Sequence, residues 1–369
     1  MSLMARVFAA GFAAGMAFAF PAESRQSVTS REWPVGAATR GFVPQGAYNW
    51  RGAATHALVT TLWYPASAGT SMTEHQIGPP ESPLFHLGQW ADDVRPAVGP
   101  FPLVVLSHGT GGSAQIMAWL GRDLASRGYV VAAVNHPGNN ALEAYTAEGF
   151  LLWWERARDL STVIDMVLRD DELGPLIDRR RIGAAGFSLG GYTTIAVAGG
   201  RTDPALFQKF CRSVEAEGCV DPPEFPNLTA RWAELEATSQ EFRSAVGEST
   251  RSYRDPRVRA VFAIAPALGQ AFIPESLRRI TIPITIVAGI DDRIVPVASN
   301  AQRLATLTPR ARLMLIPGGI GHYTFLATCS DAGRRAQPEL CDDASGVDRE
   351  ATHKRTADDA VQFFNSTLR

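Results

Sequence analysis

Apolar residues in this chain gather in short runs that lack polar alternation. Residues 103–106 (LVVL) and 129–134 (YVVAAV) are the clearest of these runs. A strand without a polar face is expected to be covered on both faces, as in a parallel sheet enclosed by helices. Related runs at 181–187, 258–264, 282–288 and 311–316 predict further strands, and THALVTTLWY at 55–64 predicts an earlier one.

Helical patterns alternate with these strands. They span 114–127, 151–169, 190–198 and about 353–368. Strand–helix–strand units of this length require crossover connections, which are nearly always right-handed. The predicted fold is therefore α/β, with a doubly wound, mostly parallel sheet.

Two segments interrupt this alternation. Residues 66–100 are rich in Pro, Gly and Ser, and are predicted to form a loop over the surface. Residues 201 to about 256 are charged, contain prolines and are partly helical in pattern, so a cap inserted at the C-terminal edge of the sheet is predicted. We expect the remainder of residues 23–369 to form a single domain with this insertion.

The composition is that of an ordinary globular protein. Hydrophobic residues make up 46% and charged residues 20% of the chain, and the formal net charge is −2. No long basic run occurs, so the sequence carries no electrostatic signature of a nucleic-acid-binding protein. No pattern indicates an oligomeric state.

The N-terminus predicts a secretory signal peptide over residues 1–22. Met1–Arg6 is positively charged, Val7–Phe20 is an unbroken apolar run, and Ala17–Ala19 offers a small-x-small cleavage pattern. The apolar run is too short to span a bilayer comfortably, and no stop-transfer pattern follows it. We therefore expect export to a periplasm or the cell exterior, without a membrane span after cleavage. A retained anchor is the alternative.

The four cysteines agree with export. Cys211 and Cys219 are close in sequence, and so are Cys329 and Cys341. Of the three possible pairings, only Cys211–Cys219 with Cys329–Cys341 closes two short loops, and such disulfides persist in an oxidising compartment. A zinc site would instead require C-x-x-C spacing or Cys with His, so no metal is expected.

The strongest chemical motif is Gly186–Gly190 (GFSLG), between a predicted strand and a predicted helix. In this context G-x-S-x-G predicts a nucleophile elbow, whose tight turn admits only small residues two positions on either side of Ser188. A serine requires an adjacent base, and His322 in GGIGH follows the last predicted strand. Among the other histidines, His136 follows a strand and could line the pocket.

The third catalytic residue is expected in GIDDRIVP, which follows the strand at 282–288. Asp292 is preferred because of the glycine three positions before it and Val-Pro three and four positions after it. Asp291 is the alternative. The role of this carboxylate would be to orient the imidazole of His322 and to stabilise its charged form.

The glycine-rich segment Ser107–Gly112 (SHGTGG) predicts an oxyanion hole. It follows the strand at 103–106, and the backbone N–H groups of Thr110 and Leu189 are the predicted donors to the developing alkoxide. A phosphate-binding loop is disfavoured because the required Lys is missing. His108 is expected to be structural, with its ring held by the loop, rather than catalytic.

These motifs together resemble the α/β-hydrolase superfamily, in particular its dienelactone-hydrolase-like and platelet-activating-factor-acetylhydrolase-like group. The resemblance rests on LSHGTGG at 106–112, GYVVAAVNHPGNN at 128–140, GFSLG, GHYTFL at 321–326, and the order Ser, Asp, His along the chain. It implies a carboxylic ester hydrolase that acts on small-molecule esters without a cofactor. True dienelactone hydrolases have Cys in place of Ser188, so the resemblance indicates mechanism better than substrate.

The predicted function is an exported serine esterase for short or medium acyl esters. One alternative is an amidase or peptidase that uses the same three residues. Another is an exported binding protein that kept the fold and lost catalysis.

Overall fold

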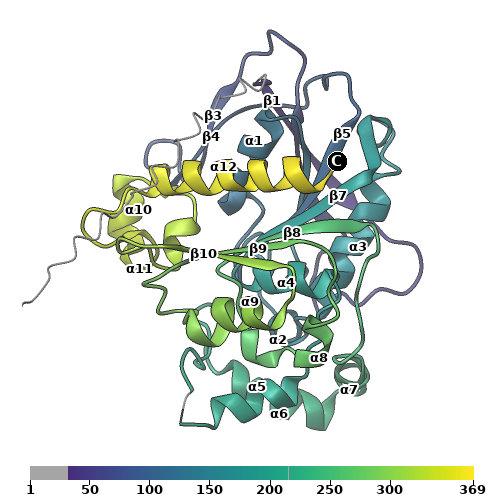
Figure 1. Ribbon diagram of the computed structural model, residues 1–369, viewed down its shortest axis with the longest axis vertical. Coiled ribbons are helices and arrows are strands. Elements are labelled where there is room, and N and C mark those ends of the chain that lie inside the picture. The colour runs from purple at the N-terminus through teal and green to yellow at the C-terminus, as the bar shows by residue number, and fades with distance from the viewer. Residues whose placement is uncertain (1–31, 215) are drawn as a thin grey trace, which may run out of the picture. The chain divides into compact units, whose positions relative to one another are not determined.

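The computed structural model describes residues 32–214 and 216–369 (Figure 1), and the predicted signal peptide lies outside the described residues. Within them, one sheet has the strand order β10-β9-β8-β7-β5-β6-β2-β1-β4-β11, and β3 pairs with β4. The strands are β1 Val35–Phe42, β2 Leu58–Pro65, β3 Thr73–Ile77, β4 Phe85–Asp92, β5 Phe101–Ser107, β6 Val130–Val134, β7 Ile177–Phe187, β8 Val258–Ile264, β9 Ile284–Gly289, β10 Ala311–Ile316 and β11 Thr328–Cys329.

The strands from β10 to β6 in this order are all parallel to their neighbours. β2 is antiparallel to both β6 and β1, so the parallel part of the sheet ends at β6. The prediction of an α/β fold with a doubly wound, mostly parallel sheet is therefore confirmed.

Helices cover both faces of the sheet. The helices are α1 Ala118–Ser126, α2 Ala147–Leu151, α3 Glu155–Val167, α4 Leu189–Val197, α5 Pro204–Cys211, α6 Leu228–Thr238, α7 Gln240–Gly247, α8 Pro274–Leu277, α9 Arg303–Leu307, α10 Asp331–Ala336, α11 Pro338–Cys341 and α12 Arg349–Thr367. In β5, Leu103 and Val105 belong to the core under α3 and α4, whereas Val104 and Leu106 belong to the core under α1 and α12. This alternation explains why residues 103–106 of the strand are all apolar.

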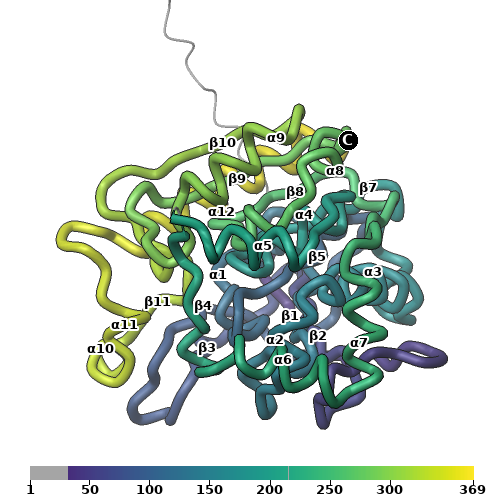
Figure 2. Tube along the Cα trace, turned by 90° about the horizontal axis from the view of Figure 1, so that it is seen from below, coloured from purple at the N-terminus to yellow at the C-terminus, as the bar shows by residue number. Residues whose placement is uncertain are grey.

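The predicted insertion contains three helices, α5, α6 and α7, between α4 and β8. These helices gather at one end of the sheet, below the strands in Figure 1 and nearest the viewer in Figure 2. Gly218 of this segment, which we call the cap, lies against Ile294 and Pro296, which follow β9. The cap therefore sits where parallel strands end, the usual place of ligand sites in such sheets.

The prediction of a surface loop at 66–100 is wrong, because this segment contains β3 and β4. In β4, buried and exposed residues alternate only at Phe85–Leu87 and the alternation then breaks, which leaves no clear strand pattern in the sequence. β1 was also not predicted; it is built largely from Gly and Ala, which have low strand propensity.

Candidate active site

Ser188 occupies the tight turn between β7 and α4. Its backbone is in the left-handed region with φ 56° and ψ −119°, a strained conformation for a residue with a side chain. A Cβ atom on Gly186 would overlap the carbonyl of Gly190, and one on Gly190 would overlap the carbonyl of Ser107. The two glycines are therefore required by the packing of the turn, as the motif predicts.

Three side chains that are far apart in sequence form a hydrogen-bond relay at this turn. His322 Nε2 lies 2.9 Å from Ser188 Oγ, and His322 Nδ1 lies 2.7 Å from Asp292 Oδ2. Because a carboxylate only accepts, the imidazole donates from Nδ1 and is free to accept the serine proton at Nε2. All three side chains are largely buried, at 7%, 5% and 4% exposure for Ser188, Asp292 and His322.

The structure places Asp292, and not Asp291, against the imidazole. The second oxygen of Asp292, Oδ1, accepts from the backbone N–H groups of Ile294 (3.1 Å) and Val295 (2.7 Å). These bonds fix the plane of the carboxylate. Asp291 is exposed and its Oδ2 accepts from Gly319 N–H at 3.1 Å.

The segment predicted to form the oxyanion hole, Ser107–Gly112, is called the oxyanion loop below and lies directly against Ser188. A Cβ atom placed on Gly109 would be 3.3 Å from Ser188 Cβ. Among the described residues, the N–H groups of Thr110 and Leu189 donate to no other group. Both remain available to a substrate oxygen beside Ser188, and Leu189 lies at the N-terminus of α4, where the helix dipole favours negative charge.

A second hydrogen-bond chain fixes this loop. The backbone N–H of His136 donates to His108 Nε2 (3.2 Å), so this ring nitrogen is the acceptor. Burial holds the pKa of His108 well below its ordinary value, so the ring is neutral and carries its proton on Nδ1. Nδ1–H then donates to the carbonyl of Gly109 (2.7 Å), which belongs to the same peptide group as the N–H of Thr110. The ring thus orients and polarises that peptide group.

The expectation that His136 could line the pocket is wrong, because the residue is fully buried behind the oxyanion loop. Its Nδ1 donates to Asp159 Oδ2 (2.7 Å), and its Nε2 accepts from Ser107 Oγ (2.8 Å). Burial lowers the pKa of His136 to about 3, so the ring is neutral. Ser107, His136 and Asp159 repeat the bonding order of the relay at Ser188, but each is 0% exposed, so no substrate reaches Ser107.

The end of this chain is a buried ion pair. Arg51 donates to both carboxylate oxygens of Asp159, at 3.0 and 2.9 Å, and Tyr48 donates to one of them at 2.6 Å. Burial alone would raise the pKa of Asp159, but Arg51 and the bond from His136 bring it below its ordinary value. The oxyanion loop is therefore anchored to a charged group that stays ionised at neutral pH.

Two cavities lie in the described part of the structure, and none of the three relay residues lines either of them. A cavity of about 80 Å³ lies between the cap and the core, and its lining includes Phe207, Ala267 and Val295. The N–H of Ala267 donates to the carbonyl of Ser188 (3.1 Å), and Val295 N–H donates to Asp292, so this cavity is adjacent to the relay.

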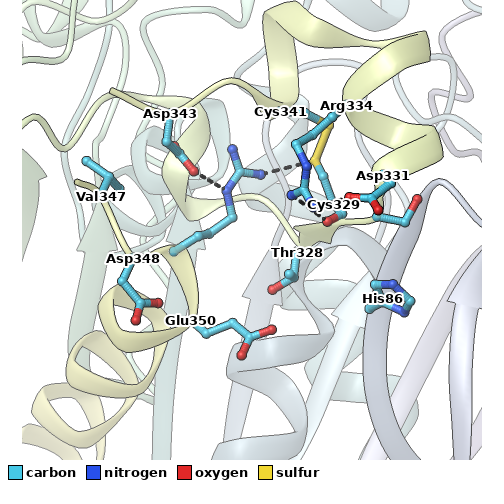
Figure 3. Close-up of a pocket in the computed structure, with 12 residues that line it drawn as sticks. His86, Thr328, Cys329, Asp331, Arg334, Cys341, Asp343, Val347, Asp348 and Glu350 are labelled. Carbon is cyan, nitrogen blue, oxygen red and sulfur yellow. Dashed lines mark hydrogen bonds and ion pairs between the residues drawn. A yellow bond between two sulfur atoms is a disulfide. The ribbon is translucent and has the colours of Figure 1, made fainter. Parts of the chain in front are cut away.

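A polar cavity of about 570 Å³ contains none of the relay residues (Figure 3). It lies among β11, α10, α11 and the start of α12. Its cations already have anionic partners, because Arg349 Nε pairs with Asp343 (2.8 Å) and Arg334 pairs with Asp331 (2.8 Å).

The four cysteines form the disulfides Cys211–Cys219 and Cys329–Cys341. The first lies in the cap, and the second forms part of the wall of the polar cavity. In residues 32–214 and 216–369, no group of His, Cys, Asp and Glu side chains has the arrangement of a metal site. No helix in the same ranges is both long and apolar enough to cross a membrane.

Comparisons with known proteins agree with the predicted group. The sequence pattern of the prolyl oligopeptidase family matches residues 115–319, which is more than half of the chain. The pattern of platelet-activating factor acetylhydrolase, isoform II, matches residues 57–151, which confirms the resemblance carried by the motifs.

Individual relatives match over shorter stretches. Platelet-activating factor acetylhydrolase of Bos taurus is 26% identical over 26% of this chain, and cutinase est1 of Thermobifida alba is 32% identical over 27% of it. Each match covers 31% of the relative's own length. A ferulic acid esterase from Streptomyces cinnamoneus superposes with a TM-score of 0.61 at 22% identity, over 91% of this chain and 90% of that one, and so shares the fold.

Proposed function

We propose that this chain, which belongs to the prolyl oligopeptidase family and has the α/β-hydrolase fold, is a serine esterase that cleaves carboxylic esters. The observation that carries the proposal is the relay from Ser188 through His322 to Asp292, with distances of 2.9 and 2.7 Å, at a strained elbow facing two free N–H groups. This combination is the one that acyl transfer by serine requires.

The proposed reaction has two steps. Ser188 Oγ attacks the ester carbonyl while its proton passes to His322 Nε2, and the resulting oxyanion accepts from the N–H groups of Thr110 and Leu189. The C–O bond to the alcohol then breaks, and the alcohol leaves with the proton from His322. Water, deprotonated by the same imidazole, releases the acid from the acyl-serine. Asp292 stabilises the transient imidazolium throughout.

The acyl chain is proposed to be short or medium in length. The cavity of about 80 Å³ that Ala267 lines is mostly apolar, with Glu217, Gln270 and Asn300 as its polar lining residues, and its size suits a few carbon atoms. An exported location is proposed as well, because two disulfides are typical of an oxidising compartment.

The first test is hydrolysis of p-nitrophenyl acetate and butyrate by the wild type and Ser188→Ala, after labelling with a fluorophosphonate. We expect turnover and labelling in the wild type, and a loss of at least about three orders of magnitude in kcat for the variant. A folded wild type that neither labels nor hydrolyses any ester would contradict the proposal and favour a binding protein on the same fold.

Peptidase activity is a second candidate, favoured by the match to the prolyl oligopeptidase family. The relay and the oxyanion donors would serve an amide equally well, with His322 protonating the leaving amine. The two candidate functions can be distinguished by comparing kcat/KM for a p-nitroanilide with that for a p-nitrophenyl ester of the same acyl group. A higher kcat/KM for the anilide would identify a peptidase or amidase.

A further inference from the structure

A turn of the cap, in the segment between α5 and α6, reaches the oxyanion loop. The N–H of Phe225 donates to the carbonyl of Pro222 (2.9 Å), which closes the turn around Glu224. The ring of Phe225 packs on Phe150 of α2, with centroids 5.3 Å apart. The position of Glu224 is therefore set by packing against the body of the domain.

Glu224 lies over Gly111, the residue after the predicted oxyanion donor Thr110. A Cβ atom on Gly111 would be 2.8 Å from Glu224 Cγ and 3.2 Å from the hydroxyl oxygen of Tyr145. Tyr145 in turn donates to the carbonyl of Gly111 at 2.8 Å. A carboxylate and a phenol ring thus stand beside Gly111 of the oxyanion loop.

Within residues 32–214 and 216–369, Glu224 has no Arg or Lys partner. Burial raises the pKa of its carboxyl, and the charge of His322 acts in the opposite direction. Burial raises the pKa of the Tyr145 and Tyr323 phenols, and the negative charge of Glu224 contributes to both increases. The electrostatic environment of His322 therefore includes the carboxylate of Glu224, which pairs with no Arg or Lys in the part of the chain that the structure describes.

We propose that Glu224 is a specificity-determining residue that favours esters with a cationic alcohol portion over neutral ones and disfavours anionic ones. The alcohol oxygen must come within hydrogen-bond reach of His322 Nε2 to receive its proton, so the alcohol portion lies where Glu224 acts. A carboxylate together with aromatic rings is the combination that recognises quaternary ammonium groups. This inference rests on the proposed ester hydrolysis and adds a substrate class to it.

The test compares two esters that differ only in charge: acetylcholine and its carbon isostere, 3,3-dimethylbutyl acetate. At pH 8.5 and low salt, the wild type is expected to hydrolyse the cationic ester with a kcat/KM about three- to tenfold higher than that for the neutral ester. This is the effect expected of one ion pair whose charges are a few ångströms apart and partly screened by solvent. Glu224→Gln should bring the ratio close to one. Because the ratio compares two esters within the same enzyme, any effect of the substitution that is common to both esters cancels. High salt should reduce the wild-type ratio in the same direction.

Glu236→Gln is the matched control, because it removes an exposed carboxylate from the same cap on α6. It should keep the wild-type ratio. A wild-type ratio near one, or an unchanged ratio in Glu224→Gln, would overturn the inference while hydrolysis of the neutral ester still supports the proposed function. Absence of hydrolysis of both esters, and of p-nitrophenyl acetate, would instead overturn the proposed function.

Discussion

At the scale of single residues, the adjacent carboxylates Asp291 and Asp292 show how one position in a loop decides a role. Asp292 uses one oxygen for His322 and the other for two backbone N–H groups, and it is buried. Asp291 is exposed and accepts one bond from Gly319. The two side chains are chemically identical, so exchanging each for its amide isolates the effect of position.

Asp292→Asn is expected to lower kcat for p-nitrophenyl acetate by about three to four orders of magnitude. The amide can donate to His322 Nδ1, which would place the ring proton on Nε2 and prevent it from accepting the serine proton. Steady-state kinetics of both amide variants measures the effect. Asp291→Asn should retain activity within about threefold, in line with an exposed surface substitution; equal losses in the two variants would disprove the assignment of Asp292.

At the scale of elements, the cap forms part of the cavity that lies next to the relay. Its helix α5 contributes Phe207 and Phe210 to this cavity of about 80 Å³, and the chain after α5 contributes Glu217 and Gly218. The remaining lining residues follow β8 and β9. The disulfide Cys211–Cys219 joins the end of α5 to the chain that follows it. Side chains of one short helix thus form part of the cavity wall, whereas the relay is held by the ends of the sheet.

Phe207→Ala should widen this cavity and shift the preference toward longer acyl chains. Removing the ring frees space next to Ala267, so kcat/KM for p-nitrophenyl octanoate relative to the acetate should rise by about tenfold, corresponding to roughly 1.4 kcal/mol of added apolar contact. Lys209→Ala, at an exposed position of the same helix, is the control and should keep the wild-type ratio. An unchanged ratio in Phe207→Ala would place the acyl chain elsewhere.

At the scale of the whole molecule, local pattern predicted the central sheet because its strands are apolar on both faces and each is followed by a helix. The relay could be predicted because each member lies in a short motif after a strand. The pair Arg51 and Asp159 could not, since 108 positions separate them and no motif marks either residue. Glu224 was equally hidden, because only the fold of the cap brings it to Gly111.

Burial of neutral histidines is a further property of the whole molecule that has a measurable consequence. Burial lowers the pKa of His136 to about 3 and of His353 to about 4, and holds that of His108 well below its ordinary value. The unfolded chain takes up protons on these side chains near their ordinary pKa, whereas the folded protein does not. The free energy of unfolding therefore falls as the pH drops from about 6.5 toward the folded values, by about 1.4 kcal/mol per pH unit for each histidine.

His353→Gln tests this linkage at one site. His353 Nε2 donates to the carbonyl of Thr324 at 2.8 Å, a bond that the glutamine amide can replace without gaining a titratable group. In urea unfolding between pH 5 and 6.5, the decline of the unfolding free energy with falling pH should be shallower in the variant by up to about 1.4 kcal/mol per pH unit. Buried carboxyls with a raised pKa, such as Glu155, contribute equally to the slopes of the wild type and the variant, so their contribution cancels in the difference between the two slopes. His86→Gln, at an exposed position, should leave the slope unchanged; an equal slope in His353→Gln and the wild type would show that His353 is protonated without cost in the folded protein.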